Sequence, residues 1–306
     1  LGSAVLTMLP GTTARQTKKL SPVENWLGYG SQGRFAAGAA APDGDAVAGF
    51  EFDKVNYAVL ERPSRHEENP EILKLRANKG YFFFGDLFCA LGAGIENLAP
   101  EYEGSIFTTV EQTLAKKPTV PVKRHGIDWY GNNGFVYGVL PKATSGSIHR
   151  KNESRSTQWR QLSKSNRNAV ETQQSMFSLW IDHGREVKNG TYAYFVACGG
   201  KVPEKLPSIL ANTVQVQAME LGQTVQALFY DAGTQVNTSM GKLSVSAPCA
   251  LILKREDGSV SVTAADGLMN RNLGRLDISL GAKQFSLSLP SGEALGKAVT
   301  RKFLFE

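Results

Sequence analysis

The sequence lacks long apolar runs and closely spaced cysteines, and each absence removes a class of function. No stretch approaches the roughly 20 apolar residues that a membrane-spanning helix needs, so we predict no membrane partner. The three cysteines, Cys89, Cys198 and Cys249, form no Cys-x-x-Cys pair, which excludes the common zinc and redox motifs. Each lies in an apolar segment, and we therefore expect all three to be buried free thiols.

Histidine and the common catalytic motifs are scarce as well. The four histidines, His66, His125, His149 and His183, are not spaced as metal ligands, and the sequence has no Gly-x-Ser-x-Gly, phosphate-loop or dinucleotide motif. We predict no cofactor and no metal. His183, between two expected strands, is interpreted as a turn residue that hydrogen-bonds to the backbone. The segment 92–97, which contains two glycines, lacks a following helix and is interpreted as a turn between strands.

The composition predicts a folded protein with a slight positive charge. The chain has 306 residues, 42% of them hydrophobic and 20% charged, enough for one large or two ordinary domains with packed cores. The net charge of +6 suits a polyanionic partner without proving one. We interpret 142–168 as a long polar loop, which is either simply solvated or an electrostatic guide for a sulfated or carboxylated chain. Its cations, opposed only by Glu153, are Lys142, Arg150, Lys151, Arg155, Arg160, Lys164 and Arg167.

Alternation of apolar and polar residues predicts an all-β protein. The last hundred residues alternate with a period of two, as at 275–280 and 284–289, and Asp257-Gly258 is a natural hairpin turn. Further strands are predicted at 106–114, 135–140, 176–182 and 191–198. Strands at 71–75 and 80–91 are expected to pair around Ala77-Asn78-Lys79.

A turn-rich segment divides the predicted strands into two groups. Residues 199–207 combine glycine, proline and charge, which is typical of a domain boundary. We predict an antiparallel β-supersandwich domain over 1–200, followed by a smaller C-terminal β-sandwich over 208–306.

Two segments combine aromatic rings with cations, a mixture that suits acidic sugars. A pyranose presents C–H groups on one side, whereas its carboxylates or sulfates require Arg or Lys. The alternative for each segment is that its aromatic rings belong to the core. The predicted substrate-binding residues are Arg15, Lys18 and Trp26 near the start, and Arg124 and Trp129 further on.

Several short motifs occur in a definite order along the chain. They are Pro10-Gly11-Thr12-Thr13, Ala77-Asn78-Lys79-Gly80-Tyr81-Phe82-Phe83, Leu91-Gly92-Ala93-Gly94-Ile95, Thr108-Thr109-Val110-Glu111-Gln112, Asp182-His183-Gly184 and Asn189-Gly190-Thr191-Tyr192-Ala193-Tyr194. Together they resemble, in sequence and in order, the motifs of polysaccharide lyases of family 8, which cleave chondroitin, dermatan and hyaluronan; the first is similar to that family's proline-glycine-threonine-threonine turn. The resemblance implies the family's central and C-terminal β domains.

The resemblance also implies β-elimination at a uronic acid, without a cofactor. The family's asparagine, histidine, tyrosine and arginine lie on an α-helical toroid, and its glutamate precedes the turn at Pro10, so we assign no catalytic residue. We expect a processed or truncated N-terminus, a chain inactive alone, and a secreted or periplasmic enzyme. The expected partners are an acidic polysaccharide and the N-terminal α-toroid, not nucleic acid. The alternative is a non-catalytic carbohydrate-binding β-sandwich module.

Overall fold

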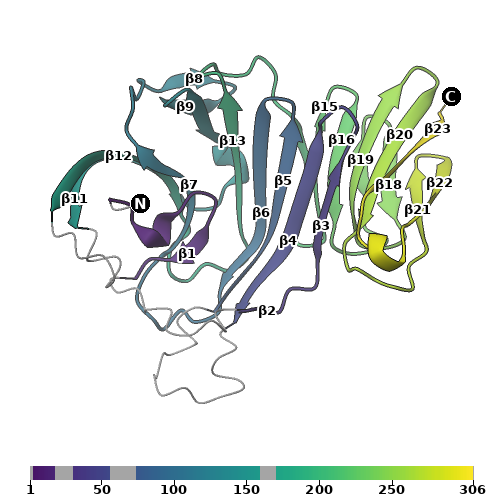
Figure 1. Cartoon of the computed structure of the whole chain (residues 1–306), viewed down its shortest axis with the longest axis horizontal. Helices are drawn as coiled ribbons and strands as arrows, with labels where there is room; N and C mark the ends of the chain where they lie inside the picture. The colour runs from purple at the N-terminus through teal and green to yellow at the C-terminus, as the bar shows by residue number, and fades with distance from the viewer. Residues whose placement is uncertain (1–2, 18–29, 56–73, 159–169, 306) are drawn as a thin grey trace. The chain divides into compact units, whose positions relative to one another are not determined.

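A computed structural model describes residues 3–17, 30–55, 74–158 and 170–305. Its regular elements are strands β1 to β23 and short 3₁₀ helices (Figure 1), and its paired strands run antiparallel. The predicted all-β fold class is therefore confirmed. No helix among the described residues is long and apolar enough to cross a membrane.

The chain separates into two compact units, and each is built from more than one segment of the sequence. The first unit comprises Leu1–Gly30, Val55–Leu75 and Glu96–Val202, and the second comprises Ser31–Lys54, Arg76–Ile95 and Pro203–Glu306. Strands from the first hundred residues therefore group with the C-terminal region. The limits 1–200 and 208–306, which follow chain order, stay a prediction.

The first unit contains a four-stranded sheet with the order β1-β7-β12-β11. β12 is buried over Met176, Phe177, Ser178 and Leu179 in succession, because it lies between two neighbours and has both faces covered. β11 is an edge strand, paired with β12 along its whole length (Figure 1). The elements are η1 (Leu6–Met8), β1 (Thr13–Arg15), β7 (Ile106–Leu114), β11 (Ser147–Gln158) and β12 (Glu171–Asp182).

A second group of strands in this unit has the order β8-β9-β10-β13. β9 and β10 form a tight hairpin in which Asn132 pairs with Phe135. The strands predicted at 106–114, 135–140, 176–182 and 191–198 are confirmed, with small shifts at their ends. The elements are β8 (Val122–Arg124), β9 (Ile127–Asn132), β10 (Phe135–Val139), η3 (Pro141–Ala143) and β13 (Gly190–Cys198).

The second unit opens with strands that pack closely on its C-terminal part. A Cβ atom on Gly49 or Gly80 would lie 2.4 or 2.8 Å from Leu228 Cδ1, so the close approach requires glycine at both positions. The amide of Gln226 adds a polar contact by donating to the carbonyl of Phe83 at 2.7 Å. The strands are β2 (Gly30–Ser31), β3 (Ala36–Ala40), β4 (Ala46–Val55), β5 (Leu75–Phe84) and β6 (Leu87–Asn97).

The rest of the second unit is a sandwich of two antiparallel sheets. One sheet has the order β14-β15-β16-β19-β20-β23 and the other β17-β18-β21-β22. Figure 1 shows β18, β21 and β22 beside β19 and β20. The elements are β14 (Ser208–Asn212), β15 (Val216–Leu221), β16 (Thr224–Phe229), β17 (Val236–Thr238), β18 (Gly241–Val245), β19 (Cys249–Glu256), β20 (Ser259–Asp266), β21 (Arg275–Leu280), β22 (Lys283–Ser288), η5 (Gly292–Ala294) and β23 (Val299–Leu304).

The core of this sandwich follows from the alternation in its strands. Leu276, Ile278 and Leu280 are buried on one face of β21, where they join apolar side chains from both sheets. The hairpin predicted at Asp257-Gly258 is confirmed, and a second hairpin joins the alternating segments 275–280 and 284–289; Gly258 and Gly281 have φ of 64° and 58°, as these tight turns require.

Three sequence predictions of local structure are wrong. β5 continues through Ala77-Asn78-Lys79, because Leu75, Ala77 and Lys79 all point into the interior, and the turn to β6 lies at Gly85. Residues 92–97 belong to β6, with Gly94 at φ 62°, and form no turn between strands.

The third error concerns the polar stretch 142–168. Most of its described part is strand β11, because pairing with β12 satisfies its backbone although its side chains are polar. Residues 159–168, including Arg160, Lys164 and Arg167, lie outside the described residues.

A glycine-to-alanine pair tests the position of the β5–β6 turn. Gly85 has φ 56°, and a Cβ atom there would meet nothing within 4 Å, so Gly85→Ala tests backbone conformation alone. We expect the free energy of unfolding in urea to fall by about 1–2 kcal/mol. Gly274→Ala, also in open space but outside the positive-φ region, should change it by less than about 0.5 kcal/mol. Equal effects of the two substitutions would contradict the turn at Gly85.

Candidate functional site

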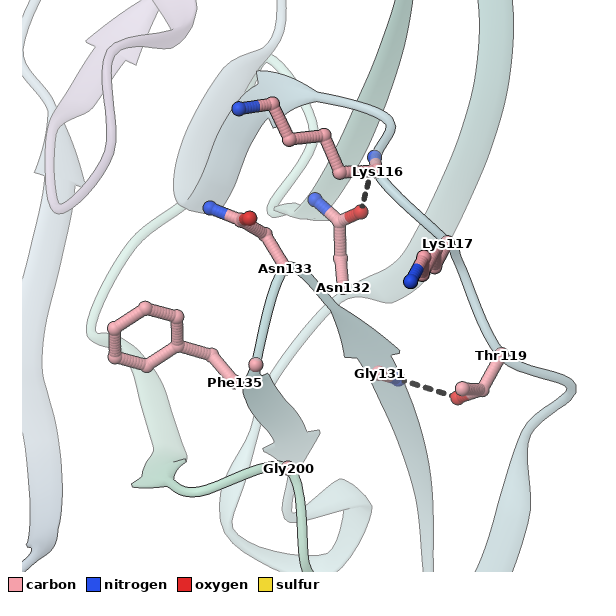
Figure 2. A pocket seen from close by; sticks show the side chains of 9 residues that line it. Lys116, Lys117, Thr119, Gly131, Asn132, Asn133, Phe135 and Gly200 are labelled. Atoms are coloured by element: carbon pink, nitrogen blue, oxygen red, sulfur yellow. Dashed lines mark hydrogen bonds between the residues drawn. The ribbon is translucent and has the colours of Figure 1, made fainter.

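A pocket of about 520 Å³ lies in the first unit, between the loop that follows β7 and the β9–β10 hairpin (Figure 2). Figure 2 shows Asn132 pointing toward the backbone of Lys116, and Thr119 beside Gly131. The residues that line it are Lys116, Lys117, Thr119, Asn132, Asn133 and Phe135, together with the backbone of Gly131, Gly134 and Gly200.

The hairpin at the base of the pocket is set by its two turn residues. Asn133 and Gly134 have φ of 52° and 82°, the left-handed conformation that a two-residue hairpin loop with the usual strand twist requires. Asparagine and glycine are the residues that adopt it most easily. The turn therefore holds Asn133 and Phe135 at the tip of the hairpin.

Asn132 joins the hairpin to the loop after β7. Its Oδ1 accepts the backbone N–H of Lys116 at 2.8 Å, and its Nδ2 donates to the carbonyl of Leu114 at 3.0 Å. The N–H of Asn133 adds a bond to the carbonyl of Lys116 at 3.0 Å. Because Asn132 is only 2% exposed, these bonds are shielded from competing water. They fix the loop 115–121 between β7 and β8, which contains Lys116 and Lys117 and is called the lysine loop below.

Thr119 makes a second connection between the same two segments. Its N–H donates to the carbonyl of Gly131 at 3.0 Å, and its hydroxyl accepts the N–H of Gly131 at 3.1 Å. A Cβ atom at position 131 would lie 2.4 Å from Thr119 Oγ1, so this contact requires glycine. Both walls of the pocket are thus held by reciprocal hydrogen bonds.

The chemistry of the lining favours binding over catalysis. Lys116 and Lys117 bring two exposed ammonium groups, Asn133 brings an exposed amide, and Phe135 brings a ring in a residue that is 39% exposed. Such groups can hold an anion and the apolar face of a sugar. The lining contains no carboxylate, imidazole or phenol that could transfer a proton.

One carboxyl–phenol pair lies deeper in the same unit. The hydroxyl of Tyr137 donates to Glu111 Oε2 at 2.8 Å. Burial raises the pKa of Glu111, an effect that this hydrogen bond opposes, and burial also raises the pKa of Tyr137. Tyr137 is only 3% exposed and Glu111 is half-buried, and we assign the pair no catalytic role.

Two of the predicted binding residues lie on β8 and β9 of the same unit, outside the lining of the pocket. Arg124 is exposed on β8 and is available to a ligand. Trp129 is 1% exposed, and its Nε1 donates to the carbonyl of Arg124 at 3.2 Å. The buried indole therefore stabilises the backbone of β8. Substrate binding by either residue stays a prediction, and for Trp129 the geometry describes a supporting position.

Arg15 lies inside the first unit and holds a loop together. Its guanidinium donates to Asn97 Oδ1 at 2.5 Å and to the carbonyls of Ala99 and Tyr102 at 2.6 and 2.8 Å. Burial lowers the pKa of Arg15. Its predicted contact with substrate stays a prediction. Lys18 and Trp26, the other two predicted residues of that segment, lie outside the described residues.

The interpretation of His183 as a backbone-bonding turn residue is confirmed. Its Nδ1–H donates to the carbonyl of Ser145 at 2.8 Å, which leaves Nε2 to accept from the hydroxyl of Thr108 at 2.9 Å. Burial lowers the pKa of His183 to about 4, against the opposing effects of the Ser145 carbonyl and Asp182. The neutral imidazole therefore joins the segment before β11 to β7.

The cysteines differ in exposure. Cys89 and Cys249 are buried free thiols, as predicted, and burial raises the pKa of each. Cys198 is exposed, so that part of the prediction is wrong. It ends β13, and its backbone pairs with Phe135 at the pocket. Residues 3–17, 30–55, 74–158 and 170–305 contain no group of three His, Cys, Asp or Glu side chains suited to a metal.

None of the residues that line the pocket was predicted from the sequence. Lys116, Lys117, Asn132, Asn133 and Phe135 were not among the predicted residues. One signal could have found the lysines, because 116–124 contains four basic residues and no acidic one. The role of Asn132 could not be predicted, because its two hydrogen-bond partners lie 16 and 18 residues earlier in the chain.

Two family models together match most of the chain. "Polysaccharide lyase family 8, super-sandwich domain" matches residues 5–205, and "Polysaccharide lyase family 8, C-terminal beta-sandwich domain" matches residues 208–272.

Curated relatives and solved structures agree with this match. Chondroitinase-AC of Pedobacter heparinus is 28% identical over 319 residues, covering 96% of this chain and 42% of the relative. A hyaluronate lyase of Thermasporomyces composti is 24% identical, covering 84% of this chain and 33% of the relative. A solved chondroitinase AC lyase has a TM-score of 0.77 at 25% identity, covering 96% of this chain and 43% of its own. The chain thus spans less than half the length of each.

Removal of the Asn132 side chain tests whether the lysine loop depends on it. We expect Asn132→Ala to lower the free energy of unfolding by about 1–3 kcal/mol, because it leaves a buried N–H and a carbonyl without partners. Hydrogen exchange at the amide of Lys116 should also accelerate. Asn152→Ala, at an exposed position on β11, should change stability by less than about 0.5 kcal/mol. An Asn132→Ala variant with unchanged Lys116 exchange would refute the role of the side chain.

The depressed pKa of His183 predicts a pH dependence of stability. The folded pKa of about 4 lies below the ordinary value of 6.5, so the unfolded chain binds more protons between these values. The contribution of His183 is complete above about pH 6.5 and is lost as pH falls toward 4, with a slope of at most about 1.4 kcal/mol per pH unit.

Urea unfolding of wild type and His183→Gln between pH 4 and 8 measures this slope. The variant should be less stable at pH 7 and show a flatter pH profile. His149→Gln, at an exposed position, should retain the wild-type profile. Parallel profiles for wild type and His183→Gln would show that His183 is not buried as a neutral group.

Proposed function

Because this chain belongs to polysaccharide lyase family 8, we propose that it forms the β-sandwich portion of an enzyme that cleaves glycosaminoglycans by β-elimination. The main support is the pair of family models, which match consecutive regions in the family's order. The 28% identity to chondroitinase AC over nearly the whole chain supports the same conclusion.

The proposed substrate is a uronic-acid-containing polymer, with chondroitin or dermatan sulfate first and hyaluronan second. Relatives named as chondroitin and hyaluronate lyases support this range. The exposed cations of the pocket and of β8 suit the carboxylates and sulfates of such polymers. We also propose a secreted or periplasmic location, since a polymer of this kind cannot cross a membrane to reach the enzyme.

The chemistry of β-elimination determines which groups the proposed enzyme must supply. The uronate carboxylate must be neutralised so that a base can remove the C5 proton, and an acid must protonate the departing O4 oxygen. The described residues offer no accessible group to which we assign these steps. We propose that the reacting groups come from the α-toroid of the parent enzyme, and that the present chain supplies one wall of the substrate cleft and is inactive alone.

The predicted binding residues take different parts in this proposal. Arg124 would contact the polymer directly, because it is exposed on β8. Trp129 and Arg15 would act as positioning residues, since one supports the backbone of Arg124 and the other fixes the loop from Asn97 to Tyr102. Lys18 and Trp26 remain proposed contacts on the strength of their residue types.

A second candidate is a carbohydrate-binding module without a catalytic partner. The pocket favours it, because its lining has groups for binding and none for proton transfer. Both candidates predict affinity for acidic glycans. Only the first predicts that the enzyme containing this chain forms unsaturated uronates.

Ultraviolet absorbance of unsaturated uronate distinguishes the candidates. The isolated chain should give no increase with chondroitin sulfate or hyaluronan, because it lacks assigned proton-transfer groups. The full-length gene product should give a steady increase with at least one of the two, and heat-inactivated enzyme is the control. Turnover by the isolated chain would overturn the proposal that it is inactive alone. A full-length protein that binds these polymers without cleaving them would establish the binding-module alternative.

A further inference from the structure

We infer that the pocket beside the β9–β10 hairpin, together with the basic strand β8, is a binding subsite for the anionic groups of an acidic polysaccharide. The inference rests on the proposed function for the identity of the polymer. It adds the location and the chemistry of a contact surface that no catalytic step requires.

The charge of the segment 116–124 is the first support. It carries Lys116, Lys117, Lys123 and Arg124, all exposed, and no acidic residue. The acid opposite in the sheet is Asp128, which pairs with Lys123 across β8 and β9. One carboxylate against four cations leaves a net positive surface, which attracts and steers a polyanion.

The spacing of the cations is the second support. The N–H of Lys116 bonds to Asn132 at the end of β9, whereas Lys123 on β8 lies opposite Asp128 near the start of β9. Asn132 and Asp128 are four residues apart, a distance of roughly 13 Å along the strand. Two cationic groups so far apart fit successive charges on an extended polymer better than one small anion.

The shape of the pocket is the third support. The ring of Phe135 lies at the tip of the hairpin beside the amide of Asn133 (Figure 2). A pyranose can place its C–H face on such a ring while its charged substituents reach the lysines. Val120 and Val122, which are 84% and 54% exposed, extend the apolar surface along the same segment.

Rigidity of the two walls is the fourth support. The lysine loop is tied to the hairpin through Asn132 and Thr119, so the backbone that carries the cations is ordered before a ligand arrives. A preorganised surface loses less conformational entropy on binding than a mobile basic loop. The hydrogen bonds thus fix the backbone positions of Lys116 and Lys117, which a mobile loop would leave undefined.

Calorimetric titration with a chondroitin sulfate hexasaccharide at low ionic strength tests the subsite. We expect Lys116→Gln/Lys117→Gln to weaken binding by at least about tenfold, a loss typical of charge-assisted contacts. The matched control is Lys283→Gln/Lys297→Gln, which removes two exposed charges from the second unit and should weaken binding less than about twofold. Phe135→Ala should weaken binding without changing its salt dependence, and a neutral maltohexaose should not bind.

Cys198 provides an independent readout, because it is exposed, pairs with Phe135, and differs from the two buried cysteines. Its alkylation should slow in the presence of the hexasaccharide and should not slow in the Lys116→Gln/Lys117→Gln variant. Equal weakening by the two lysine pairs, unprotected Cys198 or absence of binding would each overturn the subsite. These measurements need no turnover, so they fail or succeed independently of the absorbance assay for elimination.

Discussion

The structure depends on the lateral pairing of antiparallel strands, each of which must bury at least one face. In the C-terminal sandwich this constraint is met simply, since Leu276, Ile278 and Leu280 project from one side of β21 into a core shared by two sheets. Backbone groups that leave water are bonded to the neighbouring strand, and the apolar side chains remove their surface from water at the same time. Neighbouring strands that pair in this way are joined by tight turns, and the positions of these turns determine where the loops lie.

Loops have no regular hydrogen bonds to a neighbouring strand, and here buried or half-buried polar side chains supply hydrogen bonds instead. Arg15 donates hydrogen bonds to the loop after β6, and His183 bonds to both Ser145 and Thr108. Asn132 connects the lysine loop to the β9–β10 hairpin by hydrogen bonds. Each group is costly to bury without partners and stabilising with them, so its environment is specific. The pocket exists because Asn132 and Thr119 hold its two walls, and its cations are thereby fixed on an ordered backbone.

Local patterns predicted the hairpins well and the edge elements poorly. Asp257-Gly258 and Gly281 lie between clearly alternating segments, so turn and strands were visible together. β11 has no apolar alternation, and only its pairing with β12 makes it a strand. Cys198 has apolar neighbours in sequence, yet it lies where β13 emerges into solvent. No residue of the pocket lining was predicted, because the pocket joins segments that are separate in sequence.

The all-β class and the two hairpins of the C-terminal sandwich could be predicted from the sequence alone, as could the family, through the order of its motifs. Periodicity, turn residues and short motifs are local features, so they can be recognised without coordinates. The folded structure was needed to establish that β3 to β6 group with the C-terminal region, that β11 is a strand, and that Lys116 and the hairpin of Asn132 and Phe135 line one pocket. Those outcomes depend on contacts between distant segments, and the free energy of such contacts is set by packing and by the burial of polar groups.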